Sequence, residues 1–261
     1  MKVSRIEKTK EMNKERRKNI GLLLFRIVSV IIIVLCLIAI FNWFRENQAN
    51  KKILEQALSN VSVDKVVVDE NEYTILDVDF NSLQQTNNEI IGWIYLENSS
   101  INYPIVQATN NDFYLNHTFD KSYNTAGSIF VDYRCNSDFS SKNTTIYGHN
   151  RKDTSMFATL KNVIKEDWYN NSNYLTIATP EGNRIYQVFS TYKIEAEPYY
   201  TTPSFSTTQE YLDFLNTLRS RSVHDFGVSL DYDDTIVTLS TCANINTYRV
   251  VLHAKLIEII P

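Results

Sequence analysis

Hydrophobic residues form one long run near the start of the chain and only short runs after it. From residue 20 to residue 44 almost every side chain is apolar. A helix of about 25 residues, rising about 1.5 Å per residue, is long enough to cross a hydrocarbon layer of about 30 Å. Arg26 interrupts the run one turn in, where a long side chain can reach the lipid headgroups. The pattern therefore predicts a transmembrane helix over residues 20–44.

The charges on either side of this run predict its orientation. Residues 1–45 carry a net charge of +7, whereas the rest of the chain carries −11. Basic residues keep their side of a span in the cytoplasm, so the rest of the chain is predicted to lie outside the cell. A cleaved signal peptide is the alternative, but residues 41–45 lack the small side chains of a cleavage site. The acidic outer part argues against binding to nucleic acid.

The segment after the span predicts a stalk. Residues 46–60 place Ile53, Leu54 and Ala57 at helical spacing, which indicates a helix leading away from the membrane. The Val- and Asp-rich segment that follows is predicted to be extended, and a short helix is expected before Gly92. We divide the chain into a basic tail (1–19), a membrane anchor (20–44), a stalk (45–74) and an outer domain (75–261).

Beyond residue 100, short runs of β-branched and aromatic residues dominate, bounded by Asn, Asp, Gly and Pro. Such runs are typical of β-strands. The predicted strands cover residues 101–106, 128–133, 144–147, 174–178, 185–192, 235–239 and 249–258. Helices are predicted over residues 154–165 and 209–219. The fold class is therefore mostly β, with a single closed or nearly closed β-barrel that carries helices in its connections.

The chain has three cysteines, of which Cys36 falls in the predicted span. Cys135 and Cys242 remain outside, where they could form one disulfide or stay as free thiols, one of them reactive. Alternation along residues 235–242 puts Cys242 on the face opposite to Val237, at the end of a strand. From this strand alone, a buried structural cysteine and a nucleophile are both compatible with the pattern.

A cysteine nucleophile needs a base or a cation nearby and hydrogen-bond donors for the oxyanion. Of the four histidines, His149 stands out because it follows a strand and a glycine, where a barrel strand opens into a loop. Arg249 begins the strand after Cys242, so a hairpin would return its guanidinium beside the thiol. No residues have the spacing of a zinc or calcium site, and neither a metal nor another cofactor is expected.

These residues carry a resemblance to a known family. The segments Tyr147-Gly-His-Asn150 and Thr238-Leu-Ser-Thr-Cys242, followed by Arg249 and preceded by a basic membrane anchor, resemble the sortases. Sortases are membrane-anchored cysteine transpeptidases of Gram-positive bacteria. The chain is most similar to class B, over residues 75–258. This resemblance implies a closed eight-stranded β-barrel behind the anchor and stalk helices.

The resemblance also implies a reaction. Cys242 would be the nucleophile, His149 the general acid and base, and Arg249 the clamp for the oxyanion and the substrate. The enzyme would cleave the C-terminal sorting motif of surface proteins after Thr and hold the product as a thioester. An amine of the peptidoglycan precursor would then resolve the thioester and attach the surface protein to the cell wall.

Further positions match the family's substrate groove. Asn102, Val106 and Ser240 would line that groove, and the backbone N–H of Ala243 would complete the oxyanion hole. A third catalytic carboxylate has sometimes been proposed two residues after the cysteine, where this chain has Asn244. We therefore assign no third carboxylate.

Two other functions fit the same residues. A cysteine hydrolase would use the same three groups and give the thioester to water, and the sequence does not separate these activities. A surface-anchored binding module without catalytic activity would be stapled by a disulfide between Cys135 and Cys242. This second alternative leaves the Gly-His loop and Arg249 unexplained.

Overall fold

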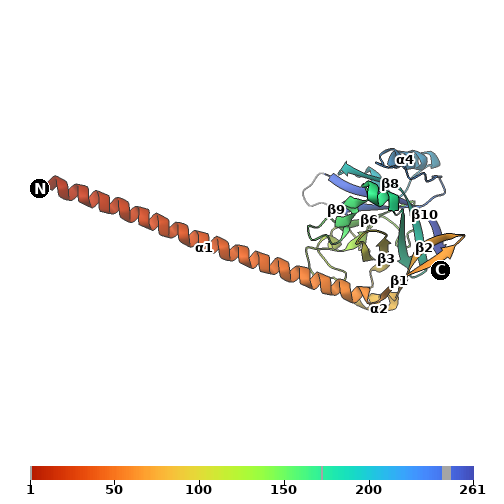
Figure 1. Ribbon diagram of the computed structural model, residues 1–261, viewed down its shortest axis with the longest axis horizontal. Coiled ribbons are helices and arrows are strands. Elements are labelled where there is room, and N and C mark those ends of the chain that lie inside the picture. Colours follow the sequence, from red (N-terminus) through yellow and green to blue (C-terminus); the bar gives the residue numbers. More distant parts are fainter. Residues whose placement is uncertain (1, 172, 243–247) are drawn as a thin grey trace. The chain divides into compact units, whose positions relative to one another are not determined.

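The computed structural model describes residues 2–171, 173–242 and 248–261. The chain divides into two compact units, residues 1–48 and 49–261. One continuous helix, α1 (Lys2–Leu58), forms the first unit and extends into the second (Figure 1). Its large apolar side chains are exposed along the predicted anchor, and by length and composition it is the one helix in the described part that could cross a membrane.

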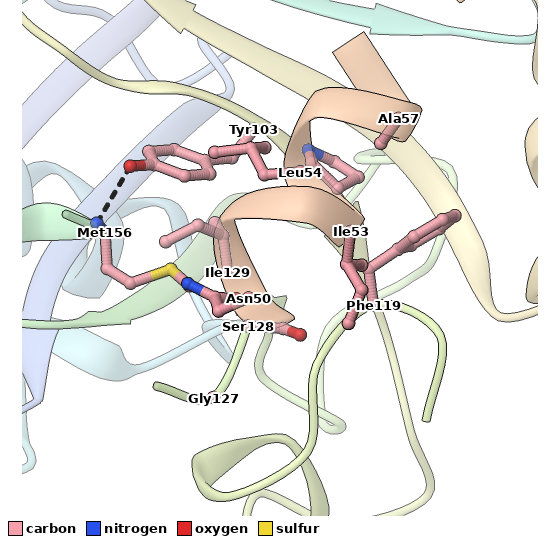
Figure 2. Close-up of a pocket in the computed structure, with 11 residues that line it drawn as sticks. Asn50, Ile53, Leu54, Ala57, Tyr103, Phe119, Gly127, Ser128, Ile129 and Met156 are labelled. Carbon is pink, nitrogen blue, oxygen red and sulfur yellow. Dashed lines mark hydrogen bonds between the residues drawn. The ribbon is translucent and has the colours of Figure 1, made fainter. Parts of the chain in front are cut away.

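The last turns of α1 pack against the barrel within the second unit. Figure 2 shows Leu54 and Ala57 beside a small apolar cavity, whose other side is formed by Tyr103 and residues 127–129. Ala57 is only 2% exposed. The helix predicted over residues 46–60 is therefore confirmed as the packed end of α1, continuous with the anchor.

Eight strands close into a barrel, as predicted. Their order around the barrel is β10-β8-β7-β3-β4-β5-β6-β9 (Figure 1). The strands are β3 (Ile90–Leu96), β4 (Asn102–Val106), β5 (Ile129–Val131), β6 (Asn143–His149), β7 (Tyr174–Thr179), β8 (Gly182–Glu195), β9 (Ile236–Cys242) and β10 (Tyr248–Ile260). The pairs β4–β5 and β6–β9 are parallel and the other pairs are antiparallel.

Short elements occupy the segments before and between the barrel strands. They are the hairpin β1 (Val61–Val68) and β2 (Asn71–Val78), the helices α2 (Phe80–Thr86), α3 (Glu166–Asn171) and α4 (Thr208–Ser220), and the 3₁₀ turns η1 (Phe113–Leu115), η2 (Phe157–Asn162) and η3 (Tyr199–Thr201). The hairpin is tied to the barrel, because the hydroxyl of Thr176 donates to the carbonyl oxygen of Thr74 at 2.6 Å. The stalk segment after residue 48 is thus folded together with the barrel.

The helix predicted over residues 154–165 is wrong. Thr154 and Met156 have φ angles of 64° and 56°, and side chains other than glycine rarely adopt these values within a helix. The segment instead forms the 3₁₀ turn η2, and the next α-helix begins only at Glu166. The positive φ angles of Thr154 and Met156, just before η2, could not be read from the pattern of apolar residues.

The hydrophobic residues of β9 belong to two hydrophobic clusters, one on each face of the strand. Val237 and Leu239 belong to the main core cluster inside the barrel. Ile236 belongs to a second cluster on the outer face, where it packs with Tyr211 and Leu215 of α4. Successive residues of a strand face opposite sides, so the face that carries position 240 is turned away from the barrel interior, as predicted.

His253, on β10, is fully buried in a chain of hydrogen bonds. The hydroxyl of Tyr192 lies 2.8 Å from its Nε2, and the hydroxyl of Thr238 lies 2.8 Å from its Nδ1. Thr238 donates its own hydrogen to Asn143 Oδ1 at 2.7 Å, so it accepts from Nδ1–H and the ring is a neutral imidazole. Burial, with a smaller contribution from Arg221, lowers the pKa of His253 to about 3.

This buried imidazole predicts acid-sensitive stability. Between pH values near the ordinary histidine pKa of 6.5 and the folded value of about 3, the unfolded chain binds one more proton than the folded chain. Stability therefore falls as the pH falls, by about 2 kcal/mol between pH 7 and pH 5. Urea unfolding of the detergent-solubilised chain, followed by tryptophan fluorescence, measures this change. His253→Gln should be less stable at both pH values but should lose this part of the pH dependence; an unchanged dependence contradicts the assignment.

Candidate active site

The ends of three neighbouring strands bring the predicted catalytic residues together. In the parallel pair β6–β9, His149 is the register partner of Cys242. In the antiparallel pair β9–β10, Val251 is the partner of Ser240, and two residues further toward the same end stands Arg249. The side chain of Cys242 and the whole of Ala243 lie outside the described residues. The strand register nevertheless supports the grouping expected from the sequence.

His149 is held by a backbone carbonyl group. Its ring is 7% exposed, and Nε2 lies 2.7 Å from the carbonyl oxygen of Leu115. A carbonyl oxygen only accepts hydrogen bonds, so Nε2 carries the proton and the neutral ring keeps its lone pair on Nδ1. Burial lowers the pKa of His149; the Leu115 carbonyl opposes this effect and the charge of Arg151 adds to it. The imidazole is therefore predominantly neutral near pH 7.

An open cleft of about 540 Å³ lies beside these strand ends. It is lined by Asn111, Asp112, Leu115, Phe130, Tyr147, Ala196, Glu197, Pro198, Tyr200, Thr201, Ser240, Thr241 and Arg249. These residues come from β5, β6, β9 and β10, from η1 with the residues before it, and from η3 with the residues before it. The cleft has the mixed polar and apolar walls that suit a peptide ligand.

A buried carboxylate ties one wall of the cleft to another. Asp132 is fully buried and accepts from Tyr147 Oη at 2.9 Å and from Arg134 Nη2 at 2.7 Å. Arg134 also donates to the carbonyl oxygen of Thr201, on η3, at 3.3 Å. Burial alone would raise the pKa of Asp132, but these hydrogen bonds outweigh it and hold the pKa below its ordinary value. The ion pair thereby fixes Tyr147 and Thr201 on two walls of the cleft.

The structure places two of the expected groove residues elsewhere. Val106 is 0% exposed, in a core cluster with Trp93. Asn102 accepts a hydrogen bond from Trp93 Nε1 at 2.6 Å. Neither residue is among the described residues that line the cleft. Ser240, in contrast, lines the cleft, and its Oγ lies 3.1 Å from Tyr200 Oη.

Sequence reasoning missed several residues of the cleft. Tyr147 belongs to the same motif as His149, and its place two residues earlier on one strand puts it on the same face. Asn111 and Leu115 sit in the long segment before β5, which the sequence analysis assigned to no element. The motif could have identified Tyr147, whereas the other two carry no local pattern that distinguishes them from loop residues.

Cys135 is a free thiol in this structure. It is 5% exposed, its Sγ lies 3.5 Å from the carbonyl oxygen of Asn143, and burial raises the pKa of its thiol to about 11. The hypothesis of a disulfide between Cys135 and Cys242 is therefore wrong. The alternative of a non-catalytic binding module, which depended on this disulfide, loses its support. A thiol with so high a pKa is also a poor nucleophile near pH 7.

Comparison with known proteins identifies this arrangement. Residues 94–257 match the sortase domain family. The chain is 34% identical to sortase B of Listeria monocytogenes over 215 residues, which covers 81% of this chain and 87% of that protein. A solved structure of sortase B from Bacillus anthracis in complex with AAEK1 superposes with a TM-score of 0.71 at 35% identity, over 82% of this chain and 99% of that one. A Staphylococcus aureus sortase B–substrate complex gives a TM-score of 0.66 at 35% identity, over 69% of this chain and 85% of that one.

Proposed function

Because this chain belongs to the sortase family of cysteine transpeptidases and is similar to sortase B enzymes, we propose that Cys242, His149 and Arg249 catalyse its transfer reaction. The observation that carries the assignment is the register of His149 with Cys242, with Arg249 on the adjacent strand. A cysteine, a base and a fixed cation at one edge of a cleft are the groups that acyl transfer requires.

In the first half of the reaction, the Cys242 thiolate attacks the carbonyl carbon that follows Thr in the sorting motif. Arg249 and the backbone N–H of Ala243 stabilise the oxyanion of the tetrahedral intermediate. As the peptide C–N bond breaks, His149 gives a proton to the leaving amine, and the acyl group stays on sulfur as a thioester.

In the second half, an amine attacks the thioester carbon and loses a proton to His149, and the Cys242 thiolate leaves. The products are an amide and the enzyme in its starting protonation state. Because burial lowers the pKa of His149, the reactive pair of imidazolium and thiolate is a minor population whenever the thiol pKa is the higher one. A bell-shaped dependence of rate on pH follows.

The sorting peptide is proposed to lie in the cleft between η1 and η3. Ser240 and Tyr147 would contact it from the strands, and Tyr200 and Thr201 from η3. Arg249 and Glu197 place opposite charges in the same cleft. This assignment replaces Asn102 and Val106 as groove residues.

The cellular setting is also part of the proposal. Residues 1–19 would remain in the cytoplasm, residues 20–44 would anchor the chain in the membrane, and the barrel domain would lie outside the cell. The basic flank before the span supports this orientation. The substrates would be surface proteins with a C-terminal sorting motif, and the acceptor an amine of the peptidoglycan precursor.

Product analysis tests the proposed function. The detergent-solubilised chain is incubated with peptides that carry five-residue motifs with Thr at the fourth position, with and without triglycine as the amine. Mass spectrometry should detect an amide adduct between the peptide acyl group and triglycine. A hydrolase would give only the free acid in both reactions, and that outcome would replace the transpeptidase assignment by the hydrolase alternative.

A further inference from the structure

Gly127 occupies a position that admits no side chain. Its φ is +63°, and a Cβ atom at this residue would lie 2.6 Å from the carbonyl oxygen of Tyr114 and 2.8 Å from that of Leu115. The same atom would lie 3.0 Å from Cδ2 of His149. Figure 2 shows Gly127 without a side chain, next to Ser128 and below the last turns of α1. The backbone of Gly127 therefore fills the space where the imidazole meets the Leu115 carbonyl group.

The turn that supplies this carbonyl group is anchored by a buried tyrosine. Tyr114 is 1% exposed, and its Oη donates to Glu89 Oε2 at 2.6 Å and accepts from Asn87 Nδ2 at 2.8 Å. Glu89 is also paired with Lys121 at 3.0 Å. On the other side of the turn, the backbone N–H of Ser128 donates to the carbonyl oxygen of Tyr114 at 3.0 Å. Tyr114 is thus fixed through both its side chain and its carbonyl group by residues outside the cleft lining.

These contacts form one continuous support for the catalytic imidazole. Tyr114 and Leu115 are adjacent in η1, so fixing the Tyr114 side chain fixes the direction of the next carbonyl group. That carbonyl group accepts the Nε2 proton of His149 at 2.7 Å. In the described part of the chain, Nδ1 of this ring has no hydrogen-bond partner, which leaves it for the reacting groups.

We propose that Gly127 and the Tyr114–Glu89–Asn87 cluster are positioning residues that fix the tautomer of His149, with the proton on Nε2 and Nδ1 exchanging protons in the reaction. The inference rests on the proposed function, because it gives a role to residues that act only through the catalytic His149. None of the four touches the cleft among the described residues.

The interpretation of a pH–rate profile in terms of the pKa of His149 depends on which charged residues a variant keeps. Arg151 lies two residues after His149, just beyond the end of β6, and its charge lowers the pKa of the ring. Asp112 precedes η1, and Arg249 is the second residue of β10. A variant that keeps these three groups and releases the Leu115 carbonyl removes a contact that favours the imidazolium form. The pKa of His149 then falls, so the acid limb of the bell-shaped profile moves to lower pH. The maximum also falls, because the imidazolium–thiolate population shrinks.

Gly127→Ala and Tyr114→Phe test this role in the full-length chain in detergent. We expect kcat/KM for the triglycine adduct to fall about 100-fold in Gly127→Ala, because an imidazole displaced by about 1 Å loses its reactive geometry. Tyr114→Phe should lose about tenfold, since the two hydrogen bonds of the hydroxyl, to Glu89 and from Asn87, are removed. In both variants the acid limb should move to lower pH.

The chain offers matched controls for both substitutions. Gly227 has a similar φ of +65° but nothing within 4 Å of its Cβ position, so Gly227→Ala introduces the same backbone strain without the contacts. Tyr211→Phe removes a buried hydroxyl that donates to the carbonyl oxygens of Lys142 and Asp234, in a different core cluster from that of Tyr114. Both controls should keep the position of the acid limb. If Gly127→Ala and Tyr114→Phe lower only the amplitude, as a loss of folded protein would, the positioning role is overturned.

The tautomer can also be measured in the unmodified protein. Nitrogen NMR of ¹⁵N-histidine-labelled chain should show the protonated nitrogen of His149 at Nε2, identified by comparison with His149→Gln. A ring protonated at Nδ1 would overturn the inference even if every variant folded poorly. Absence of any amide adduct from the unmodified chain would instead count against the proposed function, so the two failures are distinguishable.

Discussion

Cys242→Ala will lose the thioester and the amide adduct together. The rate should drop to background, at least about 10⁴-fold, because no other group can form the acyl intermediate. Cys135 cannot substitute, since its thiol is buried and has a pKa raised to about 11. Cys36 lies in the predicted membrane span. Mass spectrometry of the protein after incubation with a sorting peptide measures the thioester directly, and the adduct assay measures turnover.

Cys135→Ala is the control for this experiment. It removes a thiol of the same chemical type, and with it a weak hydrogen bond to the Asn143 carbonyl group. Its activity should stay close to that of the unmodified chain. If the thioester persisted in Cys242→Ala, or disappeared in Cys135→Ala, the assignment of Cys242 as the nucleophile would be wrong.

The grouping of His149, Cys242 and Arg249 could be expected from the sequence because each of these residues stands at or next to the end of a strand. His149 and Cys242 each end a strand with strong β propensity, and Arg249 is the second residue of the strand that follows. Alternation along β9 then places position 240 on the outer face, toward the cleft. These relations depend on neighbours in sequence or on one strand pairing, which a residue pattern can carry.

The groove could not be predicted in the same way. Leu115 and Asn111 take their places through η1, and η1 is fixed by Tyr114 contacts to Asn87 and Glu89, more than twenty residues earlier in the chain. Such contacts leave no periodic pattern in the sequence. The family resemblance suggested Val106 instead, but that residue is buried in the core.

The same long-range contacts explain why a glycine matters at position 127. The sequence analysis assigned residues 128–133 to a strand and gave Gly127 no role. The structure shows that Gly127 contacts two carbonyl groups of η1 and the ring of His149 at distances that exclude a Cβ atom. Glycine is therefore required at position 127 because the backbone there closely approaches both η1 and the end of β6.

His149→Gln should lower kcat/KM by about 10³- to 10⁴-fold while leaving a folded protein. Glutamine can still donate to the Leu115 carbonyl oxygen, but it cannot exchange a proton with the substrate. The pH profile should change in shape as well as in height. Without the imidazole, the remaining rate depends only on the fraction of Cys242 present as thiolate, so it rises with pH and shows no fall at high pH.

This change of shape separates His149 from the residues that position it. Gly127→Ala and Tyr114→Phe keep an imidazole and should keep both limbs of the bell, with the acid limb moved. His224→Gln is the matched control, because His224 also lies at hydrogen-bond distance from a backbone carbonyl oxygen, that of Ile164 at 3.1 Å, and lies outside the cleft lining. It should retain the full profile. If His149→Gln also retained both limbs, the general acid and base would have to be a different group, and the inference about its tautomer would fall with it.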